Sequence, residues 1–321
     1  MNEKDFIVVI PARIGSGRLA RKPLADICGK PMIVHTYERA LEATNPENIF
    51  IATDTEEIMR VCKKVGARSI LTSKSCKTGT DRIAELSKII KAKCYINLQG
   101  DEPLMDAENI KKMITTSIDH PDQIINGWAN IKTKKEYFSR TIPKVVLKND
   151  DNLMYMSRSP IPGNKNNDFI NAKKQICVYS FPYSALEFIL ANPLKAPVEN
   201  IEDIEILRFL EQGWDIKMIE LHGNSIAVDT PSDLQRVRKK MTQIKVRQND
   251  NYISIESLTA QDLELENAWN VNRGKTLPGT KNFALVGYSL HINFADKKCG
   301  SVFPNIFENR STNLCEFFAN F

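Results

Sequence analysis

Short apolar runs alternate with stretches of helical spacing in the first 120 residues, and this alternation limits the folds open to the chain. Strands are predicted where an apolar run is bounded by polar residues, Pro or Gly, at residues 6–10, 48–53, 68–71 and 94–98. Helices are predicted where apolar residues recur every three or four positions, at residues 33–43, 56–65, 81–91 and 107–117. Strand–helix alternation of this kind predicts an α/β fold with a mostly parallel sheet.

The pattern changes between residues 132 and 183, where strands are joined directly to one another. Residues 144–148 and 153–157 predict a hairpin, and residues 175–181 predict a further strand. After these, the sequence predicts helices at 184–191, 201–212 and 231–241, and strands at 216–221 and 225–229. An antiparallel subregion is therefore expected over the carboxyl edge of the parallel strands.

The first predicted strand leads into a loop rich in glycine and arginine. After Pro11 this loop contains Arg13, Gly15, Ser16, Gly17, Arg18, Arg21 and Lys22. Glycines let backbone N–H groups approach a ligand, and Arg and Lys balance anionic oxygens. In α/β sheets ligands bind beyond the carboxyl ends of the strands, which is where this loop, Asp54 and residues 78–82 and 99–103 fall. A site for a phosphate-rich ligand, and a triphosphate above all, is predicted there.

Two other interpretations of the loop remain open. Residues 15–20 fit a relaxed G-x-G-x-x-A dinucleotide fingerprint, with Asp54 in the place of a ribose-binding acid, which would indicate an NAD-dependent oxidoreductase. That fingerprint needs a helix to begin at the glycines, whereas Pro23 and Pro31 favour an extended loop. The other interpretation is a solvated charged loop that binds nothing.

Two aspartates are candidates for binding a divalent cation. Asp101 follows a predicted strand directly, beside a glycine, and Asp229 ends the predicted strand at 225–229. Mg²⁺ prefers one or two carboxylates together with phosphate oxygens and waters. Thr230 and Asp233 predict a helix cap, which leaves Asp229 without a structural role. For Asp101 the alternative is a turn or N-cap acid.

Charge and apolar content exclude several classes of protein. The 44 basic and 39 acidic residues give a net charge of +5, a mild excess that does not indicate a nucleic-acid partner. No apolar run approaches the ~20 residues that span a bilayer, so no membrane insertion is expected. The 7 cysteines form no C-x-x-C pair, which is typical of buried thiols in the reducing cytoplasm.

Four segments, in sequence order, resemble one enzyme family. They are IPARIGSGRLARKPL, TGTDRIAE, NLQGDEP and VDTPSDL, and they fall within residues 6–241, about three-quarters of the chain. Together they resemble the 3-deoxy-D-manno-octulosonate cytidylyltransferases (CMP-Kdo synthetases), which belong to the CMP–sugar-acid synthetases. The resemblance implies a Rossmann-like, GT-A-like nucleotidyltransferase fold, with an antiparallel subregion for dimerisation and sugar binding. It also implies Mg²⁺-dependent transfer of CMP from CTP to a 3-deoxy sugar acid, by a cytoplasmic homodimer that serves lipopolysaccharide synthesis.

The same resemblance and the loop chemistry assign roles to individual residues. Those expected at the nucleotide are Arg13, Gly15, Ser16, Arg18, Lys22, Thr80 and Arg82. Those expected at the sugar acid are Gln99, Arg158, Gln175, Tyr179 and Glu205. Lys22, Asp101 and Asp229 are the expected catalytic residues, with both aspartates on Mg²⁺. In-line attack of the anomeric hydroxyl on the α-phosphorus needs positioning and charge neutralisation but no covalent nucleophile.

The sequence departs from the family pattern on the expected sugar side. Gln175 stands where the family strand His-Leu-Gly-x-Tyr has its histidine, and Ile206 stands where Glu-Gln-Leu-Arg has its glutamine. Polar groups that pair with substrate hydroxyls determine selectivity, so the acceptor stays open. It is Kdo, its 8-amino analogue, or another ulosonic or nonulosonic acid. A nucleotide-binding protein without catalytic activity is the remaining alternative.

The last 80 residues lie outside the resemblance. We expect a cytidylyltransferase domain over residues 1–242 and an extension of unknown role over 243–321, either a small module or a truncated second domain. Residues 243–251 predict a linker, 258–268 a helix, and 283–291 a strand that runs into a turn. Residues 287–291 resemble a nucleophile elbow, but His291 replaces its last glycine, so a hydrolase is not favoured.

Overall fold

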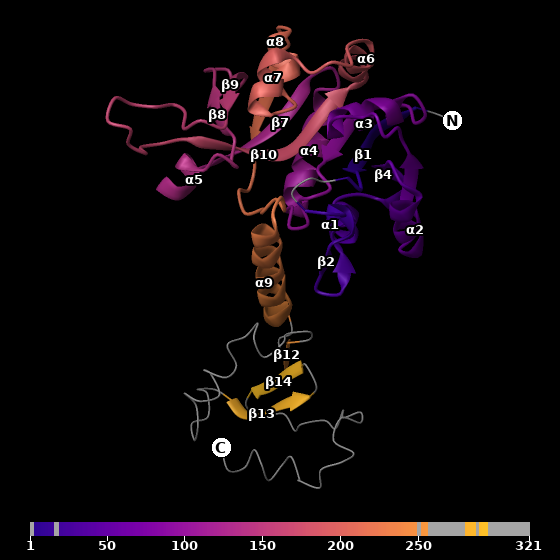
Figure 1. The fold of residues 1–321 in the computed structure, drawn as a ribbon, viewed down its shortest axis with the longest axis vertical. Coiled ribbons are helices and arrows are strands. Elements are labelled where there is room, and N and C mark those ends of the chain that lie inside the picture. The colour runs from indigo at the N-terminus through magenta and orange to yellow at the C-terminus, as the bar shows by residue number, and fades with distance from the viewer. Residues whose placement is uncertain (1–2, 16–18, 249–251, 256–279, 287–288, 295–321) are drawn as a thin grey trace. The chain divides into compact units, whose positions relative to one another are not determined.

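The computed structural model describes residues 3–15, 19–248, 252–255, 280–286 and 289–294 (Figure 1). The chain divides into two compact units, Met1–Leu234 and Gln235–Phe321. The site lies in the first unit, so the fold of that unit is given first. The predicted domain boundary at residue 242 stays a prediction.

A mixed sheet forms the centre of the first unit, in the strand order β11-β7-β10-β6-β1-β4-β5. The strands are β1 (Lys4–Ala12), β4 (Ile49–Thr53), β5 (Arg68–Leu71), β6 (Ala92–Leu98), β7 (Ile124–Asn130), β10 (Lys173–Pro182) and β11 (Ile216–Glu220). Strands β6, β1, β4 and β5 run parallel to one another, and β11 runs parallel to β7. The predicted α/β class with a mostly parallel sheet is confirmed. Strand β7 was not predicted from the sequence.

Strand β10 reverses direction within this sheet and supplies the antiparallel subregion. It pairs antiparallel with β6 and with β7, and its amino end also pairs with β8 (Lys144–Leu147). The predicted hairpin is present, because β8 pairs antiparallel with β9 (Leu153–Ser157). A second, two-stranded ribbon joins β2 (Asp26–Ile27) to β3 (Lys30–Pro31).

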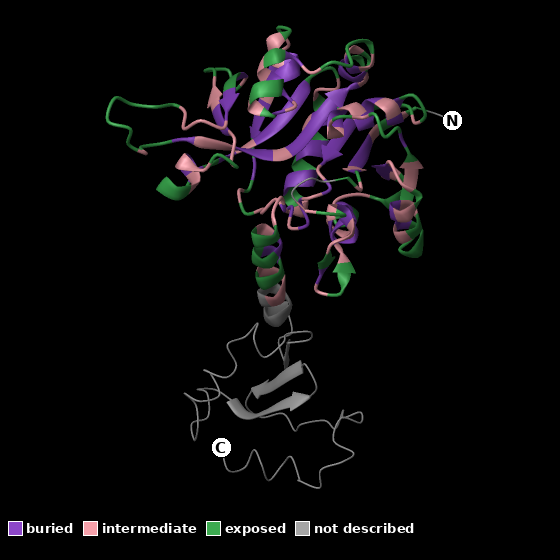
Figure 2. Ribbon diagram, viewed as in Figure 1, coloured by how far each residue is buried: buried purple, intermediate pink, exposed green. Residues whose placement is uncertain are grey.

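Helices cover both faces of the sheet, and the period-two alternation of β1 shows why. Ile7 and Val9 pack into one apolar cluster, with α3 (Gly79–Ser87), α6 (Tyr183–Ala191) and α8 (Leu207–Glu211). Val8 and Ile10 point the other way and pack with α1 (Met32–Leu41), α2 (Glu56–Lys64) and α4 (Ala107–Asp119). Both faces of the strands are therefore buried, as expected for parallel strands (Figure 2).

Capping explains where several helices begin. The hydroxyl of Thr55 accepts the N–H of Glu57 at the start of α2. Thr78 and Asp81 form a capping box at α3. Thr230 accepts the N–H of Asp233 and so caps α9 (Pro231–Gln248), as predicted from the sequence. Three short helices complete the unit: α5 (Lys134–Phe138), η1 (Lys22–Leu24) and η2 (Pro46–Asn48), the last two being 3₁₀ turns.

Three predictions of secondary structure were wrong. The helix predicted at 201–212 is two helices, α7 (Pro197–Glu202) and α8, because Asp203 adopts a left-handed conformation with φ 52° and ends α7. No strand forms at 225–229, since this segment pairs with a loop and not with the sheet. The linker predicted at 243–251 is helical up to residue 248, because α9 continues to Gln248.

The second unit contains a three-stranded antiparallel sheet in the order β12-β14-β13. Its strands are β12 (Tyr252–Ile255), β13 (Thr280–Val286) and β14 (Ser289–Phe294). In the elbow-like segment, Ser289 begins a strand and pairs with Val286, whereas a nucleophile elbow would lead into a helix. The helix predicted at 258–268 lies outside the described residues.

Candidate active site

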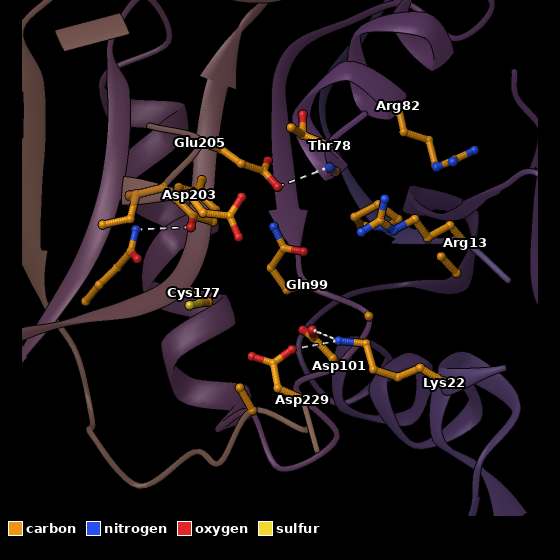
Figure 3. A pocket seen from close by; sticks show the side chains of 18 of the residues that line it. Arg13, Lys22, Thr78, Arg82, Gln99, Asp101, Cys177, Asp203, Glu205 and Asp229 are labelled. Carbon is orange, nitrogen blue, oxygen red and sulfur yellow. Dashed lines mark hydrogen bonds and ion pairs between the residues drawn. The ribbon is translucent and has the colours of Figure 1, made fainter. Parts of the chain in front are cut away.

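A cavity of about 370 Å³ opens beyond the carboxyl ends of β1 and β6 (Figure 3). Its lining comes from segments spread along the chain, among them residues 11–13 at the end of β1, 22–23 in η1, 77–79 at the start of α3, 99–101 after β6, alternate residues of β10, and 203–205 between α7 and α8. Several of these segments end strands or begin helices, where ligands of α/β proteins are usually bound. Segments separated by nearly 200 residues therefore share one site.

Lys22 joins the two aspartates on the floor of this cavity. Its Nζ lies 2.6 Å from Asp101 Oδ2 and 3.0 Å from Asp229 Oδ1 (Figure 3). Both carboxylates therefore lie close enough to bind one cation. Burial alone would lower the pKa of Lys22, but the charges and hydrogen bonds of Asp101 and Asp229 outweigh it and raise the pKa.

Backbone pairing explains why Asp229 reaches Asp101. The N–H of Val228 donates to the carbonyl oxygen of Asp101 at 2.9 Å, which fixes the next residue beside it. The hydroxyl of Ser225 also donates to the carboxylate of Glu102. Gly100 allows the loop to pass this close to β1, because a Cβ on it would lie 2.6 Å from the backbone oxygen of Pro11.

Arginines form the wall next to this pair. Arg13 lines the cavity and donates to the carbonyl oxygen of Lys77 at 3.4 Å. Arg82 is 2% exposed and reaches the cavity from α3, with its Nη1 on the hydroxyl of Thr72 and its Nη2 3.6 Å from Asp54 Oδ2. A strongly cationic surface thus lies within the same cavity as the carboxylates (Figure 3).

Glu205 occupies the amino end of α3. It accepts the N–H of Gly79 at 3.1 Å, the N–H of Thr80 at 2.9 Å and the hydroxyl of Thr80 at 2.5 Å. The free N–H groups of a helix start favour an anion, which here is a protein carboxylate. Burial raises the pKa of Glu205, against these hydrogen bonds, which lower it.

Strand β10 presents a row of side chains to the cavity from the opposite wall. The amide nitrogen of Gln175 donates to Asn126 Oδ1 and to the hydroxyl of Tyr179, both at 3.0 Å. Cys177 lies between them in the lining, and burial raises its pKa well above its usual value, so it stays a neutral thiol. This wall offers hydrogen-bonding groups with little charge.

A comparison with known proteins identifies the family. Residues 7–219 match the family model described as Cytidylyltransferase. The chain belongs to the cytidylyltransferase family. Its fold, its cationic loop and its paired carboxylates are therefore parts of a nucleotidyltransferase.

Individual relatives agree with this assignment. The 3-deoxy-manno-octulosonate cytidylyltransferase of Escherichia coli is 35% identical over 237 residues, which are 74% of this chain and 96% of that protein. The enzyme of the same name from Geobacter metallireducens is 36% identical over 252 residues, 74% of this chain and 98% of that protein. A solved structure of CMP:2-keto-3-deoxy-manno-octonic acid synthetase complexed with CTP is 33% identical, with a TM-score of 0.69, and covers 75% of this chain and 100% of that one.

Most residues expected at the site of this cytidylyltransferase lie in one cavity. Those that line it are Arg13, Lys22, Arg82, Gln99, Asp101, Arg158, Gln175, Tyr179, Glu205 and Asp229. Gly15 and Thr80 do not line it, and Thr80 donates two hydrogen bonds to Glu205. Ser16 and Arg18 lie outside the described residues. The oxidoreductase alternative finds no support, because no α-helix begins in the described part of residues 15–20.

Some lining residues were missed from the sequence. They are Lys77, Thr141, Cys177, Lys195 and Asp203. The strand period of two would have found Cys177, since it stands between Gln175 and Tyr179. No sequence pattern predicts Asp203 at the cavity, because its position depends on the break between α7 and α8.

Proposed function

We propose that this cytidylyltransferase forms a CMP-activated 3-deoxy-ulosonic acid, with CMP-Kdo as the leading candidate, from CTP and the free sugar acid. One observation carries the proposal: Lys22 contacts both Asp101 and Asp229 within a cavity that also contains Arg13 and Arg82. The names of its relatives and a CTP-bound neighbour support the choice of substrates.

Arginine and lysine would hold the triphosphate. Arg13 and Lys22 lie on the loop after β1, and Arg82 faces them from α3 (Figure 3). Guanidinium groups bind phosphate oxygens in pairs, and Lys adds a mobile point charge. Ser16 and Arg18 remain proposed nucleotide ligands on the same loop.

Mg²⁺ suits the donors that the cavity offers. Asp101 and Asp229 present hard carboxylate oxygens around a single position, now held by the amine of Lys22. The described residues hold no cluster of three or more His, Cys, Asp or Glu side chains around one point, so the remaining ligands would be phosphate oxygens and waters. When bound, Mg²⁺ would neutralise charge on the phosphates. Lys22 would then be free to move to the phosphate side.

The sugar acid would enter from the side of β10. Gln99 would lie between the two subsites, and Gln175 and Tyr179 line the cavity along the strand. Arg158 and Glu205 also line the cavity and would contact the acid. In the transfer, the anomeric oxygen bonds to the α-phosphorus, the bond to pyrophosphate breaks, and the hydroxyl proton goes to solvent.

Homodimerisation is proposed through the hairpin. Strand β9 pairs only with β8 among the described strands and so forms an edge. Met154 is 55% exposed and Tyr155 is 38% exposed on this edge. An apolar edge strand is a site where a second copy can pair. None of the described helices has the length and apolar content to cross a bilayer. A cytoplasmic location is proposed from the family resemblance of the sequence.

Pyrophosphate release tests the activity. The purified chain is incubated with Mg²⁺, CTP and one of a panel of acids: Kdo, 8-amino-Kdo and nonulosonic acids. Release with Kdo alone supports CMP-Kdo synthesis, and preference for another acid assigns the acceptor. Binding of CTP without release for any acid would indicate a nucleotide-binding protein without activity and would refute the proposal.

A further inference from the structure

Lys144 is a buried cation next to the cavity that has no place in the proposed chemistry. It begins strand β8, is 0% exposed, and pairs with Ser157 on one side and Lys174 on the other. It does not line the cavity, but its chain neighbour Pro143 does. A lysine with no exposed surface is rare, because taking an ammonium group out of water is costly unless it is fully hydrogen-bonded.

The ammonium of Lys144 is fully hydrogen-bonded, and only to backbone carbonyl oxygens. It donates to Ser139 at 2.6 Å, to Ile142 at 2.7 Å and to Arg158 at 2.7 Å. Three N–H donors thus meet three acceptors. No uncharged side chain carries three donor hydrogens on one nitrogen. Through these contacts Lys144 ties the 139–142 loop to the residue that follows β9.

Both tied segments carry residues of the cavity wall. Thr141 comes from the loop, and Arg158 is the residue whose carbonyl oxygen Lys144 holds. The side chain of Arg158 continues the chain of contacts, donating to the carbonyl oxygens of Glu202 at 2.6 Å and Asp203 at 3.0 Å. Lys144 therefore holds one end of a chain of contacts that runs through Arg158 to Asp203 in the cavity wall.

This wall is also electrically positive at its base. The charges that act on Lys144 are those of Arg140 in the loop, Arg158 directly after β9, and the carboxylate of Glu202 on α7. Glu202 is itself engaged by the N–H of Arg158 and the hydroxyl of Ser157. An anionic sugar acid would be attracted to such a wall, and this electrostatic attraction would act at a distance, without a direct contact between Lys144 and the sugar acid.

From these contacts we infer that Lys144 is a positioning residue for the acceptor subsite: it sets the place of Arg158 and Thr141 and so the affinity for the sugar acid, but not for CTP. The inference rests on the proposed function, since it takes the β10 side of the cavity as the acceptor side. Lys144 acts through the backbone of Arg158 and is not itself a catalytic residue.

The test compares acceptor and nucleotide affinities in the full-length protein. Lys144→Met keeps the length of the side chain but removes all three donors. We expect the KM for the acid that the wild-type enzyme uses to rise about tenfold, while the KM for CTP changes less than twofold. Lys144→Arg restores a charged donor and should recover part of the loss. Lys148→Met, on an exposed lysine that pairs with Asp215, is the matched control and should change neither constant.

Other outcomes overturn the inference. Equal rises in both KM values would show a general structural role, and an unchanged KM for the acid would show no role in the wall. If Lys144→Met does not fold, Lys144→Gln, which keeps two donor hydrogens, should give a smaller but equally selective rise. The absence of pyrophosphate release in the wild-type enzyme with every acid would refute the proposed function instead.

Discussion

Glu205 and Thr80 are joined by two hydrogen bonds, from the backbone N–H at 2.9 Å and from the hydroxyl at 2.5 Å. The carboxylate of Glu205 therefore accepts the free N–H groups at the start of α3, next to the cavity. It also links the segment between α7 and α8 to the start of α3. The role expected for Glu205 on the acceptor therefore comes together with a structural one.

Glu205→Ala should destabilise the fold by about 1–3 kcal/mol, because the N–H groups of Gly79 and Thr80 lose their partner in a buried place. Urea unfolding measures the change. Glu205→Gln should cost less, since its amide oxygen still accepts one N–H. Glu187→Ala, on the exposed side of α6, serves as the control. Equal stability of Glu205→Ala and the wild type would show that the capping contacts contribute nothing.

Removing either charge of the carboxylate pair should stop turnover without unfolding the protein. In Asp101→Asn and Asp229→Asn, one hard oxygen ligand is replaced by a neutral amide, and charge on the transferred phosphate is less well compensated. We expect kcat to fall by about 10²-fold or more. Pyrophosphate release measures the rate, and circular dichroism checks the fold.

A matched variant separates the site from general charge effects. Asp215→Asn removes an exposed carboxylate that pairs with Lys148. Neither residue lines the cavity, so this variant should leave kcat unchanged. Near-normal turnover by Asp101→Asn or Asp229→Asn would contradict the proposed metal site.

Lys144 should make stability depend on pH in the alkaline range. Burial, with Arg140 and Arg158, lowers the pKa of Lys144 from 10.5 to about 8. Between these two values the unfolded chain holds a proton that the native state has lost, so this group makes the protein more stable as pH rises. The free energy of unfolding of the wild type, relative to Lys144→Met, should therefore rise between about pH 8 and pH 10.5, by at most about 3 kcal/mol.

Urea titrations of both proteins at several pH values measure this difference. The hydrogen bonds that three carbonyl oxygens lose in Lys144→Met change the stability by an amount that does not vary with pH, so only the slope of stability against pH reports on the titration. A relative stability that stays flat or falls across this range would show that Lys144 keeps its proton in the native state.

The parallel strands and their helices could be predicted from sequence because local pattern and burial agree there. Residues 68–71 form β5 as predicted, and Asp101 and Asp229 both contact Lys22. The metal site itself stays a prediction. Asp101 comes shortly after the buried strand β6, so its position depends on the chain nearby. Asp229 follows no strand, and the hydrogen bond from Val228 to Asp101 places it beside Asp101.

Tertiary contacts decided the parts that the sequence did not reveal. Asp203 breaks the predicted helix at 201–212, and Glu205 then turns towards α3, where it meets Gly79 and Thr80. Nothing in local periodicity distinguishes this carboxylate from a solvent-exposed one. The burial of Lys144 is a similar case, because its three acceptors lie in two separate segments.

Gln175 should determine acceptor affinity through the groups that it holds. Its amide nitrogen donates both to Asn126, which is fully buried, and to the hydroxyl of Tyr179, which lines the cavity. Gln175→Ala removes both donors and frees Tyr179 from its position. We expect the KM for the acid to rise about tenfold, with a change of less than twofold for CTP.

A second substitution at Gln175 tests whether its two hydrogen bonds set the KM for the acid. Gln175→His keeps one ring N–H when neutral, so it can hold Asn126 or Tyr179 but not both, and its effect on KM should lie between those of the wild type and Gln175→Ala. Asn171→Ala, at an exposed position before β10, is the control. If Gln175→Ala changed the KM for CTP as much as that for the acid, β10 would not be the acceptor wall.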